Sequence, residues 1–123
     1  NRDPLPEEIE AYKPYLARQI DIISPKIIIP LGRFSMNYFL PVAKITRDQG
    51  KLFKVGKYFI LPMLHPAAAL RGNEMMRIFE ETFKKLPAAL QKVVSGGFDD
   101  NKEKEAMRPS KEKRQEDVQK RLF

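Results

Sequence analysis

The sequence predicts an α/β fold, and two observations point to that class. Segments with helical and strand-like apolar patterns alternate along the chain in the order helix, strand, helix, strand, strand, helix. The first strand-like run, IIIPL at residues 27–31, is continuously apolar, which is typical of a parallel strand covered on both faces. We therefore expect one α/β domain at residues 1–95. Residues 96–123 combine mixed charge with few apolar side chains and are predicted to form a disordered charged tail.

The first predicted helix lies within residues 3–24, where apolar side chains recur at helical spacing and two glutamates follow the start. Pro14 falls inside this pattern, so a break or kink is expected there. The strand that follows ends at Gly32. Residues 33–40 then predict a short helix that begins just after this glycine.

Two more strands and another helix are predicted after residue 50. Residues 51–64 contain two strand-like runs hinged at Val55–Lys57, which indicates a hairpin or a bent pair of edge strands. Residues 73–90 predict a second amphipathic helix. The apolar face expected for this helix comprises Met76, Phe79, Phe83 and Leu86.

The composition excludes several classes of site and suggests one kind of partner. There is no cysteine, so disulfides and cysteine-bound metals are excluded within these residues, and a single histidine argues against a zinc site. No apolar run is long enough to span a membrane and no signal peptide is visible, so we expect a cytoplasmic protein. We also expect a monomer. Residues 1–95 carry 15 basic and 9 acidic side chains, which suggests an anionic partner. Because the first residue is Asn1 rather than methionine, we expect a fragment or the loss of something upstream.

The stretch LHPAAALR at residues 64–71 is the strongest candidate for a functional site. Ligands of open α/β sheets bind outside the carboxyl ends of the strands, where this loop and the one around Gly32 are expected. His65 is the only histidine, although a lone histidine after a strand is more often structural than catalytic. Leu70 and Arg71 have no obvious core to fill, and packing of Leu70 against the next helix is the simpler alternative. Gly32 either opens an anion-binding helix terminus or, as we favour, permits a tight strand-to-helix turn.

Taken together, the segments NRDPLPEE, PKIIIPLGRF and YFILPMLHPAAALR resemble the carboxy-terminal portion of the family 4 uracil-DNA glycosylases. The resemblance covers residues 1–90. It implies a three-layer α/β/α fold with a mainly parallel central sheet, incomplete here on its N-terminal side. It also implies a DNA N-glycosidase of base excision repair, which hydrolyses the glycosidic bond of a flipped-out uracil. Uracil-containing DNA is then the expected partner.

The resemblance assigns roles to the loop after the last strand. His65 corresponds to the catalytic histidine that donates a hydrogen bond to the departing uracil. Leu70 corresponds to an apolar wedge that fills the vacancy in the base stack, and Arg71 to a contact with a phosphate or a groove edge. The small side chains between His65 and Leu70 let the loop lie close to DNA. The expected DNA-binding residues are Pro66, Ala67, Ala68, Ala69, Leu70 and Arg71.

Two departures from the family limit what this chain is expected to do alone. The family's first motif, which positions the attacking water, lies upstream of residue 1, as do its uracil-reading Asn and its base-stacking aromatic residue. The chain alone is therefore expected to be inactive. The family usually carries a 4Fe-4S cluster held by four cysteines, and this sequence has Tyr12 at the position of the last one. We expect no cofactor and no metal, with Tyr12 packed where the cluster would sit.

The last five residues, QKRLF, resemble the short peptide with which bacterial proteins bind the replication sliding clamp. Gln119 would hydrogen-bond at the rim of the clamp pocket, and Leu122 and Phe123 would fill its apolar interior. Two alternatives to a glycosylase stay open: a catalytically inactive nucleic-acid-binding module, and an interaction fragment whose tail binds the clamp. For Arg47 and Gln49, a solvated loop is slightly favoured over a contact with the DNA backbone.

Overall fold

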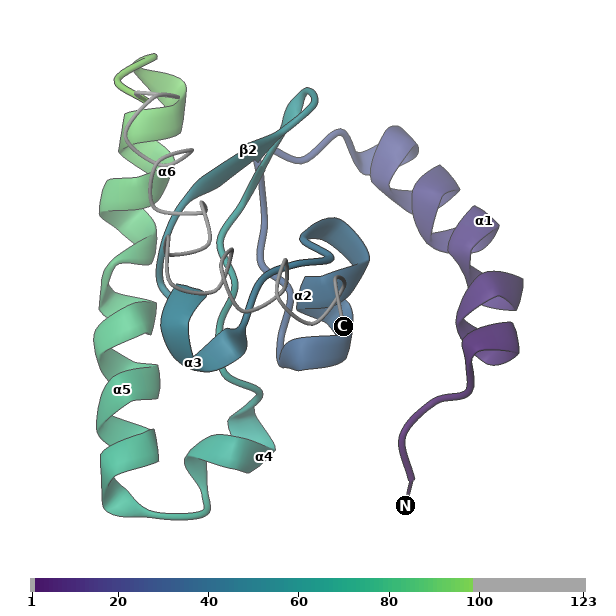
Figure 1. Ribbon diagram of the computed structural model, residues 1–123. Coiled ribbons are helices and arrows are strands. Elements are labelled where there is room, and N and C mark those ends of the chain that lie inside the picture. Colours follow the sequence, from purple (N-terminus) through teal and green to yellow (C-terminus); the bar gives the residue numbers. More distant parts are fainter. Residues whose placement is uncertain (1, 99–123) are drawn as a thin grey trace, which may run out of the picture.

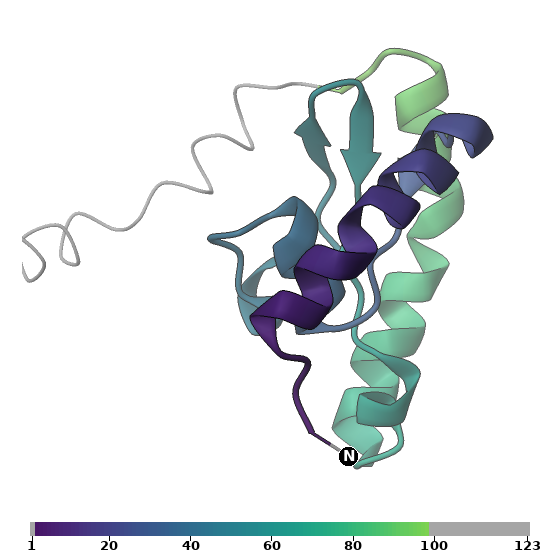
Figure 2. The same cartoon turned by 90° about the vertical axis from the view of Figure 1, so that its right-hand side faces the viewer.

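The computed structural model describes residues 2–98. In chain order the elements are α1 (Pro6–Ile23), β1 (Ile27–Ile28), α2 (Arg33–Phe39), α3 (Ile45–Asp48), β2 (Phe53–Val55), β3 (Tyr58–Ile60), α4 (Pro66–Ala69), α5 (Asn73–Lys84) and α6 (Leu86–Val94). The strands form a small sheet, with α1 on one side of it and α5 and α6 on the other (Figure 1 and Figure 2). The predicted α/β class is therefore confirmed.

The strands of the described residues form one mixed sheet in the order β1–β3–β2. β1 pairs parallel with β3, while β2 and β3 form an antiparallel hairpin. The hairpin confirms the strand pair predicted around Val55–Lys57. Its two-residue loop, Gly56–Lys57, enforces the antiparallel direction because parallel strands need a long crossover. This part of the sheet is thus mixed rather than mainly parallel.

The parallel pairing continues beyond the regular strands. The backbone N–H of Leu61 donates to the carbonyl of Ile28 at 2.9 Å, and that of Met63 donates to the carbonyl of Pro30 at 3.0 Å. Leu31 and Met63 then form an isolated parallel bridge. Pro30 has no N–H to donate, so the regular strand ends before it. The first strand is therefore shorter than predicted, but the chain still follows its neighbour to the end of the predicted run.

The helix α1 begins near the predicted start and carries a local cap. The backbone N–H of Leu5 donates to the carboxylate of Glu8 at 2.8 Å, and Arg2 pairs with the same carboxylate at 2.7 Å. The helix continues through Pro14, so of the expected break or kink the break does not occur. Pro14 is exposed on a helix without buried residues, and the carbonyl of Glu10, which loses its donor, can bind water instead.

The long helix predicted at residues 73–90 is two helices, α5 and α6, which follow one another along one side of the sheet (Figure 1). Pro87 lies in the first turn of α6, where its missing N–H is tolerated, whereas it would interrupt a continuous helix. Phe79 and Leu86 pack against the core as predicted. Phe83 does not, because it is 59% exposed. The predicted apolar face is therefore only partly buried.

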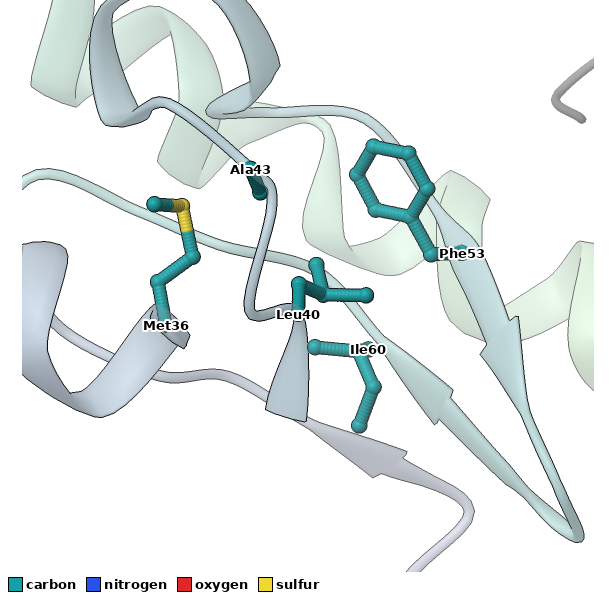
Figure 3. Packing of buried hydrophobic residues seen from close by; sticks show 5 residues of the cluster. All are labelled: Met36, Leu40, Ala43, Phe53 and Ile60. Atoms are coloured by element: carbon teal, nitrogen blue, oxygen red, sulfur yellow. The ribbon is translucent and has the colours of Figure 1, made fainter. Parts of the chain in front are cut away.

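Two hydrophobic clusters lie on the two faces of the sheet. Ile60 belongs to the first cluster and Leu61 to the second, since successive side chains of a strand point to opposite faces. The second cluster is covered by α5 and α6. Helices therefore cover both faces of the sheet. Figure 3 shows the first cluster, which comprises Met36, Leu40, Ala43, Phe53 and Ile60.

The described fold extends beyond the predicted domain boundary. Phe98 packs edge-on against Phe59, with ring centroids 5.1 Å apart, so the first residues of the predicted tail at 96–123 reach the core. Residues 99–123 lie outside the described part of the chain, and their disorder stays a prediction. Of the helices described, none is long and apolar enough to cross a membrane.

A buried carboxylate organises the loop between α2 and β2. Asp48 is 1% exposed, and its carboxylate accepts two hydrogen bonds from the Arg47 guanidinium at 2.6 and 2.7 Å and one from the Lys44 N–H at 2.8 Å. Burial raises the pKa of Asp48, but the hydrogen bonds and the charges of Arg47 and Lys51 lower it by more, so this pKa lies below its ordinary value. The ionised carboxylate therefore stabilises the fold.

We expect Asp48→Asn to lower the free energy of unfolding at pH 7 by about 1–3 kcal/mol, because it removes a charge-assisted acceptor from a buried site. Since the folded pKa is lowered, the contribution of Asp48 is present above its unfolded pKa of about 3.9 and is lost as the pH falls through the folded pKa. Urea unfolding at several pH values measures both effects. The matched control Asp21→Asn removes an exposed partner of Lys57 and should change little. Equal stability of wild type and Asp48→Asn at pH 7 would contradict this expectation.

Candidate functional site

The two loops singled out in the sequence lie side by side beyond the carboxyl ends of β1 and β3. The backbone N–H of Gly32 donates to the carbonyl of Met63 at 2.8 Å. A Cβ atom placed on Gly32 would lie 3.3 Å from the Cβ atom of His65. The pairing of the strand ends therefore brings His65 directly against the first loop, at the position where open α/β sheets bind their ligands.

Gly32 is required at this contact for two reasons. Its φ of +83° and ψ of 176° fall in a region of backbone conformation that is essentially restricted to glycine. Any side chain there would also crowd His65. These observations support the interpretation of Gly32 as a tight strand-to-helix turn, and they add the close approach to the histidine.

His65 is exposed, and one hydrogen bond fixes its ring. It is the N-cap residue of α4, and its Nδ1 accepts a hydrogen bond from the backbone N–H of Ala67 at 3.1 Å. With Nδ1 as the acceptor, the proton of the neutral imidazole is on Nε2. Within residues 2–98, no group accepts a hydrogen bond from that nitrogen. The ring therefore presents an N–H donor at the edge of the molecule.

The residues that follow form one helical turn with an exposed tip. Pro66 occupies the first position of α4, and Ala69 is buried. Leu70 is 77% exposed, so the simpler alternative, in which it packs against the next helix, is wrong. Arg71 is exposed and forms no ion pair with any described residue. Of the other two alanines, Ala67 is exposed and Ala68 is half-buried.

Arg33 and Phe34 belong to the same region; they end the segment PKIIIPLGRF, but the sequence analysis gave them no role. The Arg33 guanidinium lies 4.6 Å from the ring centroid of Phe34 and 2.8 Å from the carboxylate of Asp3. This ion pair joins the NRDPLP segment to the start of α2. The sequence signal that could have identified these two residues is an arginine directly after the glycine that ends the strand.

Arg47 lies in the short helix α3 and Gln49 directly follows it, and this segment before β2, called the braced loop below, is held by side-chain and backbone hydrogen bonds rather than simply solvated. Arg47 pairs with the buried carboxylate described above. The side-chain carbonyl of Gln49 accepts a hydrogen bond from the buried hydroxyl of Thr82 at 2.7 Å. The N–H of Gly50 donates to the carbonyl of Pro62 at 2.8 Å. The loop therefore connects α5 to the segment that leads to the histidine.

Tyr12 does not fill a closed space. It is 72% exposed, its ring lies 6.4 Å from that of Tyr15, and it lines a groove of about 220 Å³ between α1 and α2. The expectation that Tyr12 is packed is therefore not met among the described residues. In residues 2–98, no group of three or more histidine, cysteine, aspartate or glutamate side chains lies close enough to hold a metal ion.

An apolar groove of about 830 Å³ runs beside β1, on the edge of that strand away from β3. Within the described residues this edge is unpaired, so backbone N–H and C=O groups remain available there. Phe83, the apolar residue of α5 left outside the core, lies in this groove. The lining residues are Lys26, Ile27, Ile29, Phe83, Lys84, Leu86, Pro87 and Leu90.

Comparison with known proteins identifies the family. Residues 1–91 match the family model described as the uracil DNA glycosylase superfamily. The chain belongs to this superfamily. The matched residues contain both strand-end loops, so the resemblance inferred from the motifs is confirmed.

Several type-4 uracil-DNA glycosylases are similar to this superfamily member. The protein from Sulfurisphaera tokodaii is 47% identical over 96 residues, which cover 70% of this chain and 43% of the relative. The protein from Saccharolobus solfataricus is 40% identical over 99 residues, covering 73% and 46%. That from Archaeoglobus fulgidus is 36% identical over 95 residues, covering 70% and 48%. The chain thus spans less than half the length of these relatives.

We expect Gly32→Ala to lower the free energy of unfolding by about 1–3 kcal/mol and to displace His65, because it combines a disfavoured backbone conformation with a crowded Cβ atom. Gly56→Ala is the matched control, since Gly56 has φ +58° but nothing within 4 Å of the added atom. Urea unfolding measures the stability, and the NMR shifts of the imidazole report the histidine. The expectation fails if both variants are equally stable and leave the imidazole shifts unchanged.

Proposed function

We propose that this chain is the carboxy-terminal portion of a uracil-DNA glycosylase, which hydrolyses the glycosidic bond of a flipped-out uracil in DNA. The observation that carries this proposal is the exposed imidazole of His65, whose Nδ1 accepts a backbone hydrogen bond at the carboxyl ends of two parallel strands. This donor geometry occurs in a chain that matches the superfamily. We also propose a cytoplasmic, monomeric enzyme that acts in base excision repair.

The proposed chemical role of His65 is to stabilise the leaving base. As the glycosidic bond breaks, negative charge develops on the carbonyl oxygens of the uracil ring. A hydrogen bond from Nε2–H to such an oxygen is stronger in the transition state than in the substrate, so it lowers the barrier. The hydrogen bond from Ala67 supports this role because it holds the neutral ring with its proton on the outward nitrogen.

The neighbouring residues fit the extrusion of a nucleotide. The base must leave the stack, which costs a few kcal/mol. Leu70 is exposed at the tip of the loop and can occupy the vacancy, as apolar wedges of DNA-bending proteins do. Arg71 follows it and can meet a phosphate. Pro66 and the three alanines, which lie between His65 and Leu70, add little bulk, so the loop can approach the DNA closely.

The remaining half of the active site is proposed to come from residues outside this sequence. The chain spans less than half of its glycosylase relatives, and the groove beside β1 leaves an apolar surface and a strand edge available for further strands. We propose that the complete domain is a three-layer α/β/α fold with a mainly parallel sheet. The groups that position the attacking water and read the uracil would belong to that added part, so residues 1–123 alone would be inactive.

The iron–sulfur cluster usual in family 4 does not fit the residues present. The chain has no cysteine, and Tyr12, at the position of a family ligand, offers a phenol on an exposed helix surface. We propose that the complete protein lacks this cluster. No catalytic step depends on it.

A clamp-binding tail is the second candidate function, and it rests on the sequence QKRLF. Gln119, Leu122 and Phe123 lie outside the described residues, so the proposal comes from the motif alone. Loss of sliding-clamp binding by Phe123→Ala would support it, and unchanged binding would remove it. A catalytically inactive nucleic-acid-binding module is the further alternative, which the next experiment distinguishes.

For the complete protein, we expect His65→Ala to reduce the single-turnover rate of uracil excision from an oligonucleotide by about 10²–10³-fold, as for the loss of one oxyanion donor. His65→Asn keeps a side-chain donor and should lose less activity. Equal rates for wild type and His65→Ala would rule out the assigned role. DNA binding without excision by the wild type would favour the inactive module.

For the same protein, we expect iron and sulfide analysis to find less than stoichiometric amounts, because Tyr12 replaces a thiolate ligand and a phenol does not complete a four-cysteine set. Elemental analysis of protein purified without oxygen makes the measurement. A stoichiometric cluster would overturn the proposal of a cluster-free enzyme.

A further inference from the structure

A third groove, which no residue of the loop from His65 to Arg71 lines, is rich in lysine. It has a volume of about 380 Å³ and lies between the start of β2 and the helix α6. Three of its lining side chains are lysines and none is acidic. The lining residues are Gly50, Lys51, Leu52, Leu61, Lys85, Ala88, Ala89 and Lys92.

The positive charge of this groove is poorly compensated within the described residues. The ammonium group of Lys51 lies 3.8 Å from Asp48, but that carboxylate already forms a closer pair with Arg47 at 2.6 Å. Lys85 and Lys92 form no ion pair with any described residue; Lys92 lies only over an aromatic ring, 5.7 Å from its centroid. Like charges that converge without a counter-ion repel one another, so the groove favours an anionic ligand.

The small residues of the groove also let a ligand approach the protein backbone closely. Gly50, Ala88 and Ala89 supply small side chains or none, so the backbone is accessible between the lysines. The backbone of Gly50 is fixed by its hydrogen bond to the carbonyl of Pro62. A Cβ atom on Gly50 would lie 3.5 Å from the ammonium nitrogen of Lys85, so that charge sits directly beside the braced loop. The positive groups are therefore attached to a rigid part of the fold.

The groove lies near the proposed site of base extrusion. Pro62, which Gly50 contacts, precedes His65 by three residues, a path of at most about 10 Å. Phosphates follow one another along a strand of duplex DNA at roughly 3.4 Å of axial rise. Gly50, which directly precedes Lys51, is therefore bonded to the same strand end that leads to His65.

We propose that Lys51, Lys85 and Lys92 bind the phosphodiester backbone of the DNA beside the extruded nucleotide, and thus form a DNA contact separate from the His65 loop. This inference rests on the proposed function for its ligand. Lysine ammonium groups act on phosphate as point charges, so the contact adds affinity and register but no base specificity. The residues would not touch the uracil.

The test measures how the dissociation constant depends on salt, for the complete protein and a uracil-containing duplex, by fluorescence anisotropy. Each phosphate contact contributes about 0.9 to the magnitude of the slope in a plot of the log of the association constant against the log of the salt concentration. The triple variant Lys51→Gln, Lys85→Gln, Lys92→Gln should therefore lower the magnitude of this slope by about 2.7. The control Lys13→Gln, Arg18→Gln, Lys57→Gln makes the same change of charge on other surfaces and should leave most of the slope intact. Equal slopes for the two triple variants would overturn the proposal.

Two further measurements keep the outcomes separate. Because Lys51 contacts Asp48, the triple variant can lose stability; the double variant Lys85→Gln, Lys92→Gln spares that contact and should lower the slope by about 1.8. Excision at saturating protein should be unchanged in the double variant, since neither lysine reaches the base. If the wild type shows the salt dependence but no excision, the proposed glycosylase function alone is refuted. If the wild type excises uracil but the double variant has an unaltered slope, the lysine site alone is refuted.

Discussion

The hydrogen bond between Gly32 and Met63 is the interaction on which the rest of the site depends. It extends the parallel pairing of β1 and β3 past their regular ends, so two loops that are distant in the sequence meet at one edge of the sheet. Only a glycine can make this turn and still leave room for His65. The histidine is also the N-cap of α4, so its backbone is fixed by the strand end before it and by the helix after it. The hydrogen bond from the backbone N–H of Ala67 then fixes the ring.

The braced loop before β2 gives this junction a rigid support. Its buried carboxylate is fully satisfied, and its Gln49 and Gly50 reach α5 and the strand end that leads to the site. A buried polar network of this kind is costly when incomplete and rigid when satisfied. The same loop carries Lys51 into the basic groove. The proposed role of His65 and the proposed contact with the DNA backbone would therefore depend on one structural element.

The apolar surface beside β1 supports the proposal that the activity belongs to a larger protein. Among the described residues, the edge of β1 away from β3 is unpaired, and with the apolar groove and the exposed Phe83 it forms a surface of the kind that further strands and helices cover. The glycosylase relatives are more than twice as long as the segment they share with this chain. Under the proposed function, the described residues would supply the leaving-group donor and the exposed loop that follows it. The groups that position the attacking water would then come from residues outside this sequence.

The sequence by itself determined the α/β class, the hairpin, the family and the candidate histidine, because apolar periodicity, turn residues and short motifs are local properties. For Leu70 it left two alternatives open, and the structure decided for the exposed tip. It did not determine the crowding between Gly32 and His65, the bond between Gln49 and Thr82, or the convergence of three lysines in one groove. Those features join residues 30 or more positions apart. Only the tertiary structure decided them, because they depend on which surfaces the sheet brings together, and no local pattern encodes that choice.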